Sequence, residues 1–123
     1  VAALVDLQQL IGVPVIVVHS RYWALAYGDE SQRFRQALSG GVSMATSRFC
    51  FGDDFTAHNY RTIARLPANP QGADFAAAVA QRQPDRLCCV PVAAVDPPNP
   101  TTVGLGDAFV GGFLPALLPQ SAN

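Results

Sequence analysis

The sequence predicts an α/β fold in which most strands are parallel. Two stretches, 13–19 (VPVIVVH) and 86–95 (RLCCVPVAAV), are continuous apolar runs. Such runs are typical of strands that are covered on both faces, as in parallel sheets. Segments with helical spacing of apolar residues lie between them, and strands that alternate with helices indicate a layered α/β structure.

The first half of the chain predicts a second strand and a long helix. A short strand is expected at 23–28 (WALAYG). Asp29 or Ser31 can cap the helix that follows. The pair Gly40-Gly41 is expected to interrupt this helix, with helical character resuming through 42–50 (VSMATSRFC).

Two further helices are expected before the last strand. Asp54 or Thr56 can cap a helix that is closed by Pro67. The stretch 69–72 (NPQG) predicts a turn. The following segment, 73–83 (ADFAAAVAQRQ), has high helix propensity and an apolar stripe.

The chain closes with a stiff connection and an apolar helix. The stretch 96–100 (DPPNP) forces an extended backbone. From about Leu105 to Leu118 the residues are apolar on every side, which predicts a helix that is buried all round. Pro115 is expected to kink or end that helix.

Composition narrows the class of protein. The net charge is −1, so no basic surface is expected to recruit nucleic acid or an anionic membrane. All eight cations are Arg, which excludes a Walker A lysine within this chain. The three cysteines, including the vicinal pair Cys88-Cys89, are expected to be reduced thiols in a cytoplasmic protein, because their spacing fits no disulfide framework or zinc site.

The chain is expected to be part of a larger protein. Its 123 residues suit one small domain, yet 50% are hydrophobic and only 14% are charged. Further polypeptide covering this surface would explain that balance, and the sequence opens with Val1 rather than Met. No stretch approaches the length of a membrane span, and the start lacks the pattern of a signal peptide.

The stretch 101–113 (TTVGLGDAFVGGF) is the most informative segment. It places two glycines around Leu105 and an aspartate, Asp107, at the start of the last helix. The first amides of a helix lack intrahelical acceptors, and its N-terminus carries a partial positive charge. Glycines there let a phosphate approach the backbone without meeting a Cβ. The segment therefore predicts an anion-binding turn over Gly104–Asp107.

Asp107 has two interpretations. Its carboxylate can simply cap the helix. Beside a fixed anion site it can instead serve phosphoryl transfer, in which the amides stabilise charge on the moving group and the carboxylate accepts the proton of the attacking hydroxyl. Capping does not require glycine on both sides of Leu105, so the pattern favours phosphoryl transfer.

The glycine stretch resembles the signature of the ribokinase-like sugar kinases. Within that superfamily, TVGLGD after Pro100 is similar to the ADP-dependent glucokinases and phosphofructokinases. Two other stretches, 17–28 (VVHSRYWALAYG) and 41–53 (GVSMATSRFCFGD), are also similar to that group. The resemblance implies that residues 1–123 are the C-terminal, nucleotide-binding part of a three-layer, Rossmann-like α/β/α domain, without the N-terminal part and the sugar lid.

The resemblance also implies a catalytic arrangement. Asp107 would be the general base. The anion hole would be formed by the backbone amides of Gly104, Leu105, Gly106 and Asp107. Val103 and His19 would lie at the nucleotide. His19 also ends a buried strand, where α/β sheets place ligand-binding loops.

The implied reaction is phosphoryl transfer from ADP to a hexose or hexose phosphate, such as glucose or fructose 6-phosphate, with AMP as the product. Mg²⁺ would bridge the phosphates, and its ligands and the sugar contacts would lie in the remainder of the parent kinase. The isolated chain is therefore expected to be inactive. Two alternatives are an ATP-dependent kinase of the ribokinase type and a non-catalytic nucleotide-binding remnant.

Several other polar residues have ordinary interpretations. Arg21 and Arg48 can contact phosphate or can simply be solvated. Asp53-Asp54 is interpreted as a helix cap rather than a metal site. His58 has no second ligand at metal-binding spacing and is expected to be solvated.

Overall fold

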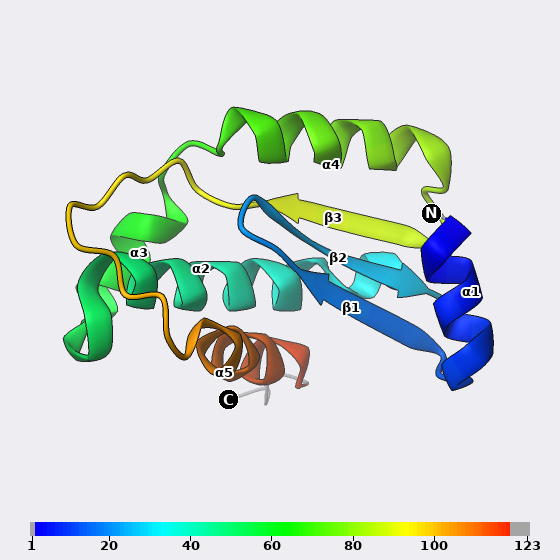
Figure 1. Cartoon of the computed structure of the whole chain (residues 1–123), viewed down its shortest axis with the longest axis horizontal. Helices are drawn as coiled ribbons and strands as arrows, with labels where there is room; N and C mark the ends of the chain where they lie inside the picture. The colour runs from blue at the N-terminus through cyan, green and yellow to red at the C-terminus, as the bar shows by residue number, and fades with distance from the viewer. Residues whose placement is uncertain (1, 119–123) are drawn as a thin grey trace, which may run out of the picture.

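The computed structural model of the chain describes residues 2–118 and consists of a small sheet between two helical layers (Figure 1). The strands are β1 (Val15–His19), β2 (Trp23–Gly28) and β3 (Leu87–Pro91). The α-helices are α1 (Ala2–Ile11), α2 (Arg35–Phe51), α3 (Ala57–Ala64), α4 (Pro70–Arg82) and α5 (Leu105–Leu117), and the 3₁₀ turns are η1 (Ser31–Phe34) and η2 (Gly52–Asp54).

The described sheet is antiparallel, so the predicted parallel direction is wrong. Its strand order is β1-β2-β3, and both neighbouring pairs run antiparallel. Residues 20–22 alone connect β1 to β2, whereas a parallel pair needs a crossover of about a dozen residues or more. The second pair is joined through α2, α3 and α4, which bring the chain back to the edge of β2 that lies opposite β1, so that β3 runs antiparallel to β2.

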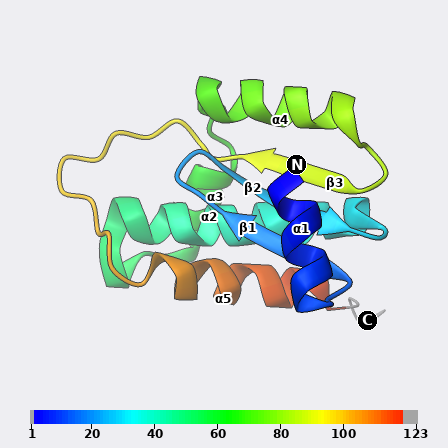
Figure 2. The same cartoon turned by 45° about the vertical axis from the view of Figure 1, so that its right-hand side comes forward.

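Helices cover both faces of the sheet, which confirms that part of the prediction. Alternate residues of β2 enter two different cores. Ala24 and Ala26 pack with α2 and α5, whereas Leu25 and Tyr27 pack with α4 and α1. Figures 1 and 2 show α4 on one side of the strands and the α2–α5 pair on the other.

The vicinal cysteines follow the same alternation. Cys88 belongs to the core beneath α2, and Cys89 belongs to the core beneath α4. Both thiols are free and buried, and burial raises the pKa of Cys89 to about 11. These thiols are therefore packing groups that stay protonated at neutral pH.

The predicted interruption of α2 at Gly40-Gly41 is wrong, because the helix runs unbroken through both glycines. Their lack of a side chain serves a helix crossing instead. A Cβ on Gly40 would lie 2.6 Å from the Gly112 carbonyl oxygen, and one on Gly41 would lie 2.6 Å from the Phe109 ring. The two glycines thus allow α5 to pack closely on α2.

The starts of α3 and α4 show how capping sets helix boundaries. Thr56 caps α3 in a capping box with Asn59, which confirms one of the two capping residues predicted for this helix. The predicted turn at 69–72 is wrong, because Asn69 caps α4 and Pro70 occupies its first position. Proline is favoured there, since its missing N–H would have no helical partner.

The last helix is less covered than the sequence predicted. Only Phe109 and Gly112 of α5 are buried in the described part of the chain, whereas Val110 is 50% and Leu114 is 52% exposed. Pro115 lies inside the helix, which ends two residues later at Leu117. Across residues 2–118, no helix combines the length and apolar character needed to cross a membrane.

Candidate phosphate-binding site

The glycine turn, which we define as residues 103–107, forms the N-terminus of α5. Gly104 has φ of +77°, a left-handed conformation that glycine adopts without steric penalty. It is the N-cap residue, and its carbonyl accepts the Ala108 amide at 3.0 Å. Within residues 2–118, the amides of Gly104, Leu105, Gly106 and Asp107 have no hydrogen-bond acceptor. They are available to an anion.

Two contacts hold the segment before α5 against the end of α2. The Thr101 amide donates to the Phe49 carbonyl oxygen at 3.0 Å. Arg48 Nε donates to the Val103 carbonyl oxygen at 2.8 Å. Gly104 lies directly under this guanidinium, since a Cβ there would come within 3.0 Å of Arg48 Nε. The glycine turn is therefore tied to a helix of the core.

Asp107 lies at the third position of α5 with its carboxylate unengaged. It accepts no hydrogen bond and forms no ion pair with the residues that the structure describes. The residue is exposed and lines a cavity of about 490 Å³ together with Arg48, Gly104 and Phe55. The capping interpretation is thus not what the structure contains. The Asp107 carboxylate and Gly104 border the same open space.

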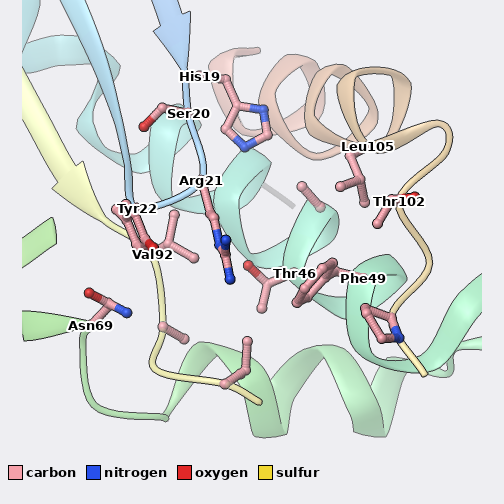
Figure 3. Close-up of a pocket in the computed structure, with 14 residues that line it drawn as sticks. His19, Ser20, Arg21, Tyr22, Thr46, Phe49, Asn69, Val92, Thr102 and Leu105 are labelled. Carbon is pink, nitrogen blue, oxygen red and sulfur yellow. The ribbon is translucent and has the colours of Figure 1, made fainter. Parts of the chain in front are cut away.

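A second cavity, of about 540 Å³, lies on the other side of the turn. Figure 3 shows His19 and Arg21 on one side of it, Leu105 and Thr102 on the other, and Thr46 and Phe49 of α2 between them. Its volume is in the range of small-molecule sites. Leu105 faces this cavity and Asp107 faces the first one, so the start of α5 separates the two.

His19 lies at the end of β1 and packs on α5. Its ring stacks on Phe109 with centroids 4.4 Å apart and an interplanar angle of 16°. Burial lowers the pKa of His19, because the charged imidazolium loses solvation. The imidazole is therefore neutral at neutral pH and offers one donor and one acceptor.

Comparison with known proteins gives a fold but no sequence family. No protein-family model matches the chain, and no curated protein matches it significantly. A phosphofructokinase from Pyrococcus horikoshii, solved with AMP, matches with a TM-score of 0.72 over 92% of this chain and 28% of its own, at 21% identity. A hypothetical ADP-dependent phosphofructokinase from the same organism matches with a TM-score of 0.74 over 94% of this chain and 28% of its own, at 21% identity. The chain has the fold of part of an ADP-dependent phosphofructokinase.

A third structure agrees. It is an ADP-dependent kinase in complex with fructose 6-phosphate and ADPβS, which matches with a TM-score of 0.73 over 97% of this chain and 31% of its own, at 17% identity. These matches confirm the resemblance to ADP-dependent phosphofructokinases at the level of the fold. The chain spans less than a third of the length of these kinases.

Within this ADP-dependent phosphofructokinase fold, the expected site residues are not all in one place. Gly104 and Asp107 line one cavity, and His19 and Leu105 line the other. A Cβ on Gly106 would meet no atom within 4 Å, so its backbone is open to approach. The Val103 side chain is 75% exposed, and its carbonyl is the group that makes a specific contact.

The sequence pattern leaves the role of Arg48 open and does not reveal its partner. Arg48 pairs with Asp53, which was expected only to cap a helix. The contact between Arg48 and Val103 joins residues 55 positions apart, and no local pattern could have predicted it. The signal that was available is the position of Arg48 in the last turn of a helix, where cations are favoured.

The described residues do not offer a metal site of their own. Residues 2–118 contain no group of three or more His, Cys, Asp or Glu side chains that could hold a metal ion. Asp107 is therefore a single acidic side chain beside the turn rather than one member of an acidic cluster. The described residues therefore supply no ligand set for Mg²⁺ as a resident metal.

Proposed function

We propose that this chain is the nucleotide-binding part of an ADP-dependent sugar kinase. The proposed reaction transfers the β-phosphoryl group of ADP to a hydroxyl of a hexose or hexose phosphate, glucose or fructose 6-phosphate, and releases AMP. The observation that carries the proposal is that the amides of Gly104–Asp107 are unengaged at the start of α5, and that Gly104 and the free Asp107 carboxylate border the same cavity. The fold likeness to ADP-dependent phosphofructokinases supports ADP as the donor.

The chemistry assigns a separate role to each group. The Asp107 carboxylate accepts the proton of the sugar hydroxyl as its oxygen attacks the β-phosphorus. The bond from that phosphorus to the oxygen bridging the α-phosphate breaks, and AMP leaves with the electron pair. The amides of Gly104, Leu105 and Gly106 donate to the phosphoryl oxygens as charge develops on them. Because the amides are held before the substrate arrives, little reorganisation is needed during the transfer.

The sugar contacts and the Mg²⁺ that a nucleotide carries belong, in this proposal, to the remainder of the parent kinase. The exposed apolar residues of α5 support that arrangement. Val110, Leu114 and Leu117 all lie on one helix and are 36–52% exposed. Exposed apolar patches of this kind mark surfaces that bind other polypeptide. Here the remaining two thirds of a kinase would cover them.

The decisive experiment replaces Asp107 by Asn in the intact kinase that contains this chain. The substitution preserves shape but removes the proton acceptor, so kcat should fall by about 10²–10⁴ while the dissociation constant for ADP changes little. The matched control is Asp74→Asn, which removes the same charge from an exposed position on α4, across the sheet. The control should retain full turnover. Wild-type turnover in Asp107→Asn would exclude the proposed role.

The donor is tested in the same assay. AMP formation from ADP should exceed ADP formation from ATP when each nucleotide is supplied with glucose or fructose 6-phosphate. A preference for ATP would assign the protein to the ATP-dependent branch. Binding of nucleotide without any transfer, in the intact protein with both sugars, would identify a non-catalytic remnant.

A further inference from the structure

Arg48 has an environment that is unusual for an arginine at the end of a helix. Its side chain is only 20% exposed. Nε donates to the Val103 carbonyl oxygen at 2.8 Å, and Nη1 pairs with the Asp53 carboxylate. Burying a cation is costly unless it is paired and hydrogen-bonded, and Arg48 is both. The guanidinium is thus held in one orientation against the peptide that precedes Gly104.

That contact determines where the Gly104 amide points. The Val103 carbonyl and the Gly104 N–H belong to one planar trans peptide, in which they point in opposite directions. By holding the carbonyl on the α2 side, Arg48 directs the N–H away from itself. The hydrogen bond from the Thr101 amide to the Phe49 carbonyl lies two residues earlier, so it does not itself hold the peptide between Val103 and Gly104. Gly104 itself resists rotation least of all residue types.

We propose that Arg48 is a positioning residue for phosphate binding at the glycine turn, acting through the Val103 carbonyl. The inference rests on the proposed function and adds a residue to its machinery. Arg48 is not the phosphate ligand in this arrangement, because Asp53 already offsets its charge. It orients the Gly104 amide, which is the first donor of the turn. The β-phosphate of ADP would lose that donor if the peptide turned.

The test compares Arg48→Met with Arg33→Met in the ¹⁵N-labelled intact kinase that contains this chain. Both substitutions remove one positive charge and one ion pair, since Arg33 pairs with Glu30 on the surface. The first readout is the NMR order parameter of the Gly104 amide without ligand. The second is the pair of dissociation constants for ADP and AMP, because only ADP carries the β-phosphate. Arg48→Met should lower the order parameter of the Gly104 amide and raise the dissociation constant for ADP about tenfold. The dissociation constant for AMP should change by no more than about twofold.

Arg33→Met should change neither readout. The inference is wrong if Arg48→Met leaves the order parameter of the Gly104 amide and the affinity for ADP at wild-type values. It is also wrong if the affinity for AMP falls as much as the affinity for ADP. Should Arg48→Met fail to fold, Arg48→Lys takes its place with the same expectations, since one ammonium cannot reproduce the two fixed directions of a guanidinium. If the wild-type kinase binds no ADP, the proposed function fails, while the Gly104 order parameter still tests the positioning role.

Discussion

Replacing Gly112 by Ala should destabilise the chain, whereas the same change at the adjacent Gly111 should stabilise it. The two positions differ in what a new methyl group would meet. At Gly112 it would overlap the Gly40 carbonyl oxygen and lie 2.7 Å from Met44 Cβ. At Gly111 it would meet no atom within 4 Å. Figures 1 and 2 both show α5 next to α2, on the side of the sheet away from α4.

The magnitudes follow from two opposing terms. Alanine in a helix interior is favoured over glycine by about 0.5–1 kcal/mol, and this is the whole expected effect at Gly111. At Gly112 the same gain is opposed by overpacking of roughly 1–3 kcal/mol. The upper end applies, because the Gly40 carbonyl is backbone and cannot rotate away. We expect a net loss of about 2 kcal/mol, and a gap between the variants of roughly 3 kcal/mol, or about 10 °C in Tm.

Urea unfolding followed by circular dichroism measures both variants directly. The slope of the free energy against urea concentration should stay unchanged, because the surface exposed on unfolding is the same. Since α5 carries the glycine turn, Gly112→Ala should also weaken ADP binding. The reasoning is refuted if Gly112→Ala stabilises the chain as much as Gly111→Ala does. The two helices would then not meet at these glycines.

Three further substitutions test single features. Gly104→Ala forces a Cβ into a left-handed conformation beside Arg48 Nε, so it should cost about 1–2 kcal/mol and weaken ADP binding by calorimetry; unchanged affinity would contradict the turn geometry. Thr56→Ala removes the cap of α3 and should lower the free energy of unfolding in urea by about 1 kcal/mol; an unchanged free energy would contradict the capping box. Burial lowers the pKa of His19 below 6.5, so the unfolded chain takes up a proton that the folded chain resists. The free energy of unfolding should therefore fall as pH drops below 6.5, and His19→Gln should flatten that slope; an equal slope in both proteins would contradict it.

Local signals predicted local features well. Thr56 is a threonine at the boundary of a helical pattern, and it caps α3. The start of α5 directly after Gly104 followed from the glycines and from the apolar segment behind them. These features depend on the backbone groups of a few adjacent residues, which the residue types alone largely determine.

Features that depend on distant partners could not be predicted in the same way. Gly40 looked like a helix breaker, because glycine lowers helix propensity by about 1 kcal/mol relative to alanine. Its role as a crossing point is set by Gly112, which lies in another helix. The stretch 69–72 combined two turn-forming residue types, yet Asn69 and Pro70 are equally suited to begin a helix. Residue type alone did not separate these alternatives.

The error in strand direction does not bear on the predicted anion site. An apolar run reports that both faces of a strand are covered, and the sheet is covered by α4 on one face and by α2 and α5 on the other. Coverage says nothing of direction, which depends on the connections between strands. The predicted anion site needs only a helix N-terminus, the glycines that open it and a carboxylate beside it. Those lie within Gly104–Asp107, so their arrangement is independent of how β1, β2 and β3 pair.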